Sequence, residues 1–415
     1  MTPRRIARQG AWLLPLWVAL LGADRIDLLG GRGPFVLTPF LLLTAPVGAM
    51  ELAARRARLG EAWRRVPPRA LAHGAFLLVL VAVAAASLLG SLDPATTGQR
   101  TALLAVQALG ASVIIWARHD DRSGHAALAR GARLGLLLAL IADVAQGAAF
   151  ASWLPTGVML GEWRLVDLQA FNYAGVVPRL SGLALDPNRA ALLTLIHLAL
   201  LGADAPPRAR GWSALGALLL GLTLSRSGIL AAGVALLVRA GTAPSATAGR
   251  EPMRGAPRLT LALATGVCVL SLALLAAPEA RATAADRLAP AAERLSAAEG
   301  SARLHGTLIG RGIAEATRDV PRTLLGAGYG TSYLLLRDVF GTRYGNFHSL
   351  YVSTWVEMGI GALLIVLTLL LVPFRWAIRW RPALAALVVF NLFYQAGAEP
   401  GLWAMLALAW QEGAT

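Results

Sequence analysis

Several residue types that support common enzyme chemistries are scarce or missing in this chain. All 38 basic residues are arginine, so there is no lysine for a Schiff base or for a phosphate-binding P-loop. The only cysteine, Cys268, excludes an intrachain disulfide, and the Cys/His spacing of a zinc site does not occur. The absence of an Asp-x-Asp motif disfavours a metal-dependent sugar-nucleotide transferase. We therefore expect neither a metal nor another cofactor.

Charged residues are also scarce, at 15% of the chain, whereas hydrophobic residues make up 56% and the mean hydropathy is +0.59. Apolar runs approach the roughly 20 residues that a helix needs to cross a bilayer core of about 30 Å. The net charge of +15 lies largely in short loops beside these runs, as in membrane proteins. We expect contact with membrane lipids and no binding of nucleic acid.

The hydropathy pattern predicts an all-α polytopic membrane protein with about 12 transmembrane helices. The predicted segments are 11–29, 34–50, 70–90, 101–117, 134–151, 189–202, 212–224, 228–238, 259–277, 349–373, 383–397 and 400–412. Transmembrane helices 1–9 would occupy residues 1–277, a large helical periplasmic loop 278–348, and transmembrane helices 10–12 residues 349–415.

Arginine placement predicts the orientation, because short cytoplasmic loops of membrane proteins are enriched in basic residues. The best fit puts both termini of the multi-pass chain in the cytoplasm. The loop 278–348 carries nine arginines, but long loops are translocated largely regardless of charge. Arg4 to Arg8 precede an apolar stretch without a clean cleavage site after it, so we expect a retained first helix.

Residues 212–238 contain Arg226 in the middle of an apolar stretch. A single helix here would place later arginine-rich loops outside, so we favour two short helices that meet at Ser225-Arg226-Ser227-Gly228. A charge at membrane depth costs at least a few kcal/mol and is usually kept for function. With the positive end of a helix starting at Ser227, Arg226 would suit a phosphate. The alternative is an arginine that reaches the outer headgroups.

The predicted periplasmic loop contains two helical stretches. A seven-residue repeat covers 279–295, and a second helix is predicted over about 301–325. Arg311, Arg318 and Arg322 are spaced i, i+7 and i+11, which places them on one face of that helix. Arginine binds diphosphate bidentately, but for any single one of these residues a solvated or headgroup-binding face is the better explanation.

His348 lies where the chain re-enters the membrane, in Asn346-Phe-His-Ser-Leu-Tyr351. A neutral imidazole can accept a proton from a hydroxyl, although a single histidine at an interface is more often a polar terminus. Glu357 lies nine residues further on and should face away, so we expect a structural role with Gly359 and Gly361.

Two further groups have simple structural explanations. Asp186 before Pro187 predicts a helix start, because aspartate caps a helix and proline fits its first turn. His119-Asp120-Asp121 with His125 is better explained as a solvated loop than as a metal cluster.

Four stretches, in this order, resemble the bacterial O-antigen ligase family. Arg179-Leu-Ser-Gly-Leu-Ala-Leu-Asp-Pro-Asn188 is similar to the stretch before a helix, Ser225-Arg226-Ser-Gly to the Ser-Arg-Gly turn, and Leu325-Gly-Ala-Gly-Tyr-Gly330 to the Gly-x-Gly loop of that family. His348-Ser-Leu-Tyr351 with Glu357-Met-Gly-Ile-Gly361 resembles its His-Asn-x-Tyr-Leu and Glu-x-Gly-x-x-Gly hallmark. The resemblance covers about 175–365, and Ser349 stands where the family usually has asparagine.

The resemblance implies a GT-C-like, metal-independent, inverting glycosyltransferase of lipopolysaccharide biosynthesis. Its donor would be undecaprenyl-diphosphate-linked O-antigen, and its acceptor a hydroxyl of the lipid A-core oligosaccharide. His348 would be the general base, and Arg226, Arg303 and, less directly, Arg179 would bind the donor diphosphate. Possible supporting residues are Asn188, Ser225, Tyr351 and Arg311.

Other functions fit parts of the same pattern. An O-antigen or capsule polymerase, or a protein O-oligosaccharyltransferase, of the same superfamily would share the donor chemistry and differ in the acceptor. A 12-helix secondary transporter usually has two six-helix halves, whereas here the long loop comes late and outside. A non-enzymatic assembly protein would not need Arg226 at membrane depth.

Overall fold

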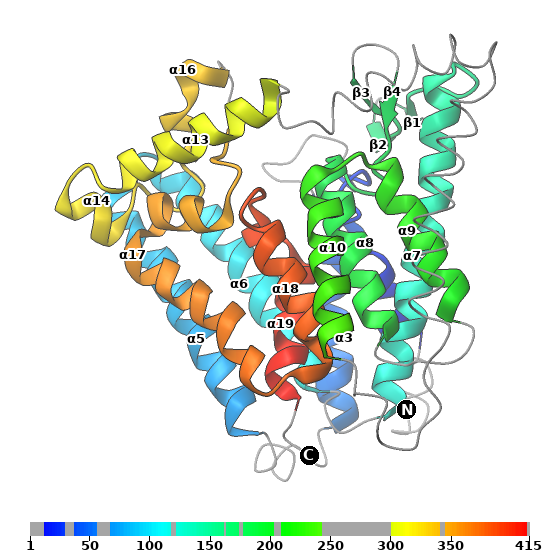
Figure 1. Cartoon of the computed structure of the whole chain (residues 1–415), viewed down its shortest axis with the longest axis horizontal. Helices are drawn as coiled ribbons and strands as arrows, with labels where there is room; N and C mark the ends of the chain where they lie inside the picture. Colours follow the sequence, from blue (N-terminus) through cyan, green and yellow to red (C-terminus); the bar gives the residue numbers. More distant parts are fainter. Residues whose placement is uncertain are drawn as a thin grey trace.

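The protein forms a helical bundle, seen here in a computed structural model (Figure 1). The structure describes residues 12–29, 37–55, 67–117, 122–161, 163–173, 177–202, 209–242, 300–340 and 345–412. The predicted segment 259–277 and the predicted repeat at 279–295 lie outside these residues.

The first half of the bundle contains α2 (Leu13–Ala19), α3 (Pro39–Arg55), α5 (Pro68–Ala86) with η2 (Ser87–Gly90), α6 (Pro94–Trp116), α7 (Arg122–Phe150), α8 (Pro187–Gly202), α9 (Ala209–Leu222) and α10 (Arg226–Gly241). The second half contains α13 (Gly300–Ala316), α14 (Val320–Leu325), α15 (Ser332–Leu335), α16 (Arg337–Phe340), α17 (Leu350–Leu371), η3 (Val372–Arg375), η4 (Ile378–Trp380), α18 (Arg381–Phe390), η5 (Ala396–Ala398) and α19 (Pro400–Gln411). Helices distant in sequence pack together, among them α10 with α18 and α6 with α19.

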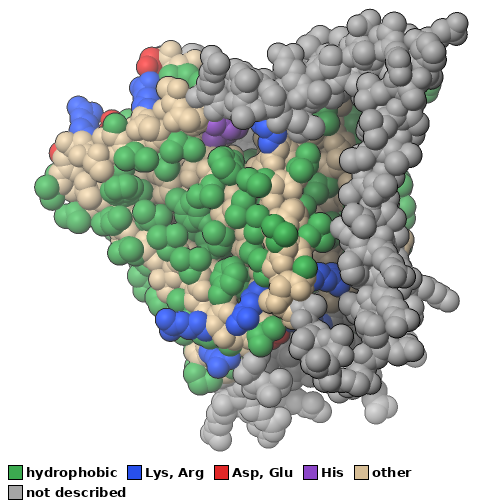
Figure 2. All heavy atoms as spheres, viewed as in Figure 1, with side chains coloured by type: hydrophobic (Ala, Val, Ile, Leu, Met, Phe, Trp, Pro, Cys, Tyr) green, Lys and Arg blue, Asp and Glu red, His purple; other side chains and the backbone are tan. Residues whose placement is uncertain are grey.

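Three of the described helices are long and apolar enough to cross a membrane. They are Pro68–Gly90, Pro94–Trp116 and Leu350–Arg375, and Pro39–Ala53 and Gly211–Leu222 are shorter apolar helices. The face seen in Figure 2 is largely apolar over α10 and α17, and Leu78 of α5, Leu237 of α10 and Leu364 of α17 are each more than half exposed. Such a surface suits a membrane protein. The number of 12 spans and the orientation stay predictions.

Two predicted spans are too long. In the described part of segment 11–29 the only helix is the seven-residue α2, and the ten-residue helix α18 ends at Phe390, well inside segment 383–397. After α2 the chain turns at Gly22, where φ is +69° and an added Cβ would lie 2.3 Å from a methyl carbon of Leu193. At 1.5 Å per residue, a ten-residue helix reaches about 15 Å, which is half of a bilayer core.

Two β-hairpins between α7 and α8 were not predicted. Strands β1 (Gly157–Leu160) and β2 (Trp163–Asp167) pair antiparallel, as do β3 (Phe171–Tyr173) and β4 (Val177–Arg179). Buried Arg25 ties the first hairpin to the segment before α8, since it donates to the carbonyls of Asp167 in β2 and of Ala184 at 2.6 and 2.8 Å. The strands are short, so no apolar run announces them.

The predicted helix over 301–325 is wrong in its extent. Helix α13 ends at Ala316, and α14 begins at Val320 after Asp319, whose side chain accepts the backbone N–H of Arg322 at 2.8 Å. Arg318 and Arg322 therefore do not continue one helix face from Arg311. The α13–α16 segment lies together at one end of the bundle (Figure 1).

The glycine loop, residues 325–330, follows α14 and has glycine at every second position. It is hydrogen-bonded to α17 beside a break in that helix. The break lies at Gly359, where φ is +83° and an added Cβ would lie 2.0 Å from the carbonyl oxygen of Leu324. The N–H groups of Ala327 and Gly328 donate to the carbonyls of Val356 and Glu357 at 2.8 and 3.0 Å. The loop thereby satisfies carbonyls that the interrupted helix leaves without intrahelical partners.

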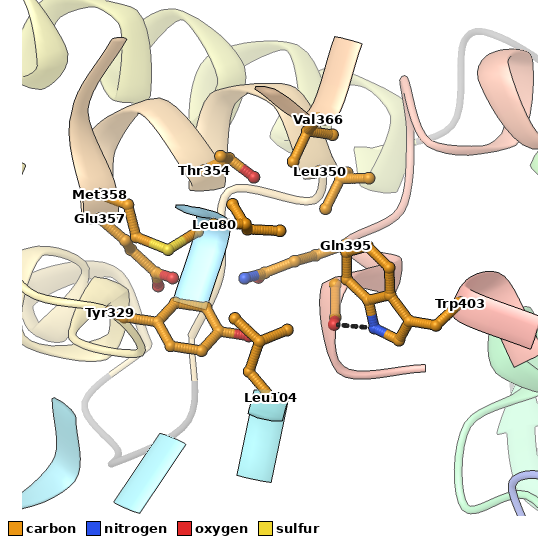
Figure 3. A pocket seen from close by; sticks show the side chains of 11 residues that line it. Leu80, Leu104, Tyr329, Leu350, Thr354, Glu357, Met358, Val366, Gln395 and Trp403 are labelled. Carbon is orange, nitrogen blue, oxygen red and sulfur yellow. Dashed lines mark hydrogen bonds between the residues drawn. The ribbon is translucent and has the colours of Figure 1, made fainter. Parts of the chain in front are cut away.

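Glu357 has a structural position beside this break. Its Oε1 accepts hydrogen bonds from the hydroxyl and the N–H of Ser332. Figure 3 shows the Glu357 carboxyl group and the Gln395 amide pointing toward one another in a small cavity that Tyr329 and Trp403 also line. The role predicted for Glu357 agrees with this arrangement. Gly361 does not have the structural role predicted for it, because an added Cβ there meets nothing within 4 Å.

We predict opposite effects for alanine at the two glycines of α17. Gly359→Ala should lower the thermal unfolding temperature in detergent, since a left-handed backbone costs an alanine about 1–2 kcal/mol before any clash. Gly361→Ala should leave that temperature equal or higher, because alanine in a helix interior is about 0.5–1 kcal/mol better than glycine. Equal destabilisation by both substitutions would contradict the break at Gly359.

Candidate functional site

The predicted interruption at Arg226 is present. Helix α9 ends at Leu222, Leu224 has a φ of +48°, and α10 begins at Arg226. The Ser225 hydroxyl caps α10 by accepting the N–H of Gly228 at 3.2 Å. Half-buried Arg226 thus occupies the first turn of a helix, where the helix dipole adds positive potential.

Three predicted residues meet at this turn. The Asn188 side-chain oxygen accepts hydrogen bonds from Nη2 of Arg179 at 3.2 Å and from the Ser225 hydroxyl at 3.0 Å. Nε of Arg179 also donates to the Thr223 carbonyl at 3.0 Å. Arg179 is buried, with 8% of its surface exposed. These bonds give Arg179 a direct role in holding the turn that carries Arg226.

The start of α8 agrees with the prediction from Asp186-Pro187. The Asp186 carboxylate accepts the N–H groups of Asn188 and Arg189 at 2.7 and 3.0 Å, and α8 begins at Pro187. The cap therefore fixes the turn that carries Asn188.

Arg189, which was not predicted, forms two ion pairs inside the bundle. Its Nε lies 2.7 Å from the Glu399 carboxylate, and its Nη1 pairs with Asp24. These partners precede α19 and follow α2. An arginine at the first position of the apolar run 189–202 was the signal that could have pointed to such pairs.

His348 lies in a tight turn before α17. Its φ is +52°, and its N–H donates to the Asn346 side chain at 2.8 Å. Its neighbours Phe347 and Ser349 are buried, whereas His348 is half-buried.

Two groups from other elements act on the His348 ring. The His305 ring of α13 is stacked on it, with ring centroids 4.3 Å apart and planes inclined by 20°. Burial lowers the pKa of His348 below its ordinary value of 6.5, and the negative charge of Asp186 opposes that shift. His348 is accordingly a neutral proton acceptor at pH 7, with a carboxylate near enough to stabilise its protonated form.

Two kinds of interaction relate Arg226 and His348 to the start of α8. Asn188 follows Asp186 in the same turn and hydrogen-bonds to Ser225, which precedes Arg226. The charge of Asp186 also acts on His348, so the turn before α17 lies within electrostatic range of the start of α8. Figure 2 shows histidine at the surface near the end that carries α13.

Other predicted residues have different surroundings. Arg311 forms a bidentate ion pair with Asp338 at 2.6 and 2.8 Å, and the Tyr351 hydroxyl donates to the Val388 carbonyl at 2.9 Å. These contacts join α13 to α16 and α17 to α18. Arg303 belongs to the first turn of α13, but its side chain lies outside the described residues, so its role stays a prediction.

The described residues contain no group of three or more metal-ligating side chains that could hold a metal ion. Residues 118–121 of the predicted solvated loop lie outside the described part of the chain. No protein-family model and no curated protein matches this chain. The resemblance to O-antigen ligases therefore rests on the motifs themselves.

We predict that Asp186→Asn lowers the pKa of His348 further. Asparagine caps a helix about as well as aspartate, so α8 should keep its start while the negative charge that favours the imidazolium is lost. The pKa can be measured by NMR titration of protein labelled with ¹³C at histidine Cε1. Asp319→Asn makes the same change at the start of α14 and should leave His348 unaffected. An unchanged or raised pKa in Asp186→Asn would contradict the placement of Asp186.

Proposed function

We propose that this protein is an O-antigen ligase of the bacterial inner membrane. It would transfer O-antigen polysaccharide from undecaprenyl diphosphate to a lipid A-core hydroxyl on the periplasmic side. The observation that carries the proposal is that Ser225, beside Arg226, hydrogen-bonds to Asn188, that Asn188 shares a turn with Asp186, and that the charge of Asp186 acts on His348. A cationic helix start and a neutral imidazole suit an anionic leaving group and a hydroxyl nucleophile.

In the proposed reaction the acceptor hydroxyl attacks the anomeric carbon from the face opposite the diphosphate. A new C–O bond forms, the bond to the diphosphate breaks, and its electron pair leaves with the lipid diphosphate. The hydroxyl proton passes to the His348 imidazole. The configuration at the anomeric carbon is inverted, and no metal takes part.

His348 suits the general base because its lowered pKa keeps the ring neutral at pH 7. Proton transfer to a positioned base typically contributes about 10²- to 10⁴-fold in rate. Asp186 assists once the proton has moved, because its charge stabilises the imidazolium. The transfer rate should rise as the pH rises through the pKa of His348. It should be low at pH values below that pKa, since only the neutral ring accepts the proton.

Arg226 suits the diphosphate because negative charge grows on the leaving group as the glycosidic bond breaks. A guanidinium at a helix start offers fixed donors and positive potential where that charge develops. Arg179 and Asn188 would support this role by holding the Ser225 turn. Arg303 remains a proposed second ligand of the diphosphate.

Arg226 can be tested against an arginine at the other end of the same helix. Arg226→Ala should abolish glycan transfer by purified protein in vitro, and Arg226→Lys should restore little, because lysine lacks the planar fork. Arg239→Gln removes the exposed arginine in the last turn of α10 and should keep transfer near wild type. Full transfer by a well-expressed Arg226→Ala protein would remove Arg226 from the mechanism.

His348 can be tested in cells and in vitro. His348→Ala and His348→Gln should bind the lipid-linked donor yet lose at least about 10²-fold in transfer rate, while Ser349→Ala should retain more activity. Wild-type transfer should persist in the presence of chelator. Near-normal transfer by His348→Ala would overturn the base assignment, and loss of wild-type transfer in chelator would overturn the metal-free reaction.

A lipopolysaccharide gel from a strain lacking the gene separates the related functions. Loss of every O-antigen band from the core, restored by wild type but not by His348→Ala, is the result expected of a ligase. Core that still carries a single repeat would indicate a polymerase. An unchanged ladder would contradict both activities.

A further inference from the structure

The stacked His305–His348 pair has no counterpart in the sequence motifs. His305 belongs to α13, and His348 to the turn before α17. Their centroid separation of 4.3 Å and their inclination of 20° describe two nearly parallel imidazole rings in contact. Two rings from separate elements meet in this way only if both backbones are held in register.

The backbones on both sides of this pair are held by packing. An added Cβ at Gly312 of α13 would lie 2.9 Å from the ring of Phe347, so the helix closely approaches the residue before His348. Leu308, Phe347 and Val356 are buried in one apolar cluster. The Arg311–Asp338 ion pair joins α13 to α16. Helix α13 is therefore a fixed support beside the turn.

The His348 ring itself needs a further restraint. Its backbone is fixed by the Asn346 hydrogen bond, but the terminal torsion of a histidine side chain is broad and roughly two-fold. A flat neighbour in face-to-face contact restricts that torsion, because rotation out of the stack loses contact area and aromatic attraction. His305 supplies such a neighbour.

We propose that His305 is a positioning residue for His348, whose imidazole plane it fixes by stacking. The inference rests on the proposed function, in which His348 accepts the proton of the acceptor hydroxyl. The flat ring of His305 would position His348, and proton exchange by His305 would not be needed. We therefore expect phenylalanine at position 305 to preserve the positioning of His348 and alanine to lose it.

The stack can be observed without any activity. A ring proton held over the face of another aromatic ring resonates upfield, and the chain has only six histidines. In protein labelled with ¹³C at histidine Cε1, the signal lost in His348→Gln identifies His348. That signal should move downfield in His305→Ala and stay upfield in His305→Phe. No movement in His305→Ala would overturn the stack.

Transfer kinetics test the positioning role. His305→Ala should lower kcat about 10-fold or more with unchanged KM values for donor and acceptor, because a misplacement of 1 Å can cost about 10²-fold. His305→Phe should restore most of kcat, and Ile313→Ala, an exposed change on the same helix, should have no effect. Wild-type kcat in His305→Ala, or equal loss in both His305 variants, would overturn the proposal.

The two measurements separate failure of this inference from failure of the proposed function. If purified wild-type protein transfers no glycan while the NMR signals behave as expected, the ligase assignment is wrong and the stack stands. If wild-type protein transfers glycan but His305→Ala neither shifts the His348 signal nor lowers kcat, the ligase assignment stands and the positioning role is wrong.

Discussion

The arrangement of the candidate site depends on the ion pairs that Arg189 forms inside the helical bundle. Its guanidinium contacts the carboxylates of Glu399 and Asp24, which belong to segments far apart in the sequence. The side chains are 17%, 11% and 5% exposed for Arg189, Asp24 and Glu399, so removing one partner would leave a charge that water compensates only in part. The pairs thus fix the first turn of α8, and that turn carries both Asp186 and Asn188.

Local features of the fold were predictable, because short-range chemistry determines them. Asp186-Pro187 announced the start of α8, and Ser225-Arg226 announced the interruption between α9 and α10. The lengths of α2 and α18 were not predictable from hydropathy, which cannot separate an apolar helix from an apolar turn buried against it. The β-hairpins depend on Arg25 reaching carbonyls more than a hundred residues away, which no local pattern records.

The candidate site follows the same division. The sequence drew attention to Arg226 and His348 because a charge in an apolar run and a histidine at a membrane boundary are both unusual. It missed the pairing of His305 with His348, because two isolated histidines give no sign of their separation in space. It also treated Asp186 only as a helix cap. The fold also places this carboxylate where it acts on the His348 imidazole.

The glycine loop connects the α13–α16 segment, which carries His305, to α17, which follows His348. Gly359 breaks α17 where Ala327 and Gly328 donate to its carbonyls, so the α13–α16 segment is hydrogen-bonded to the helix that follows His348. The same segment carries His305 on α13. A substitution at the loop would therefore displace the His305 ring relative to the His348 turn without touching either residue. The glycines and the histidine pair therefore belong to one continuous set of contacts between the α13–α16 segment and α17.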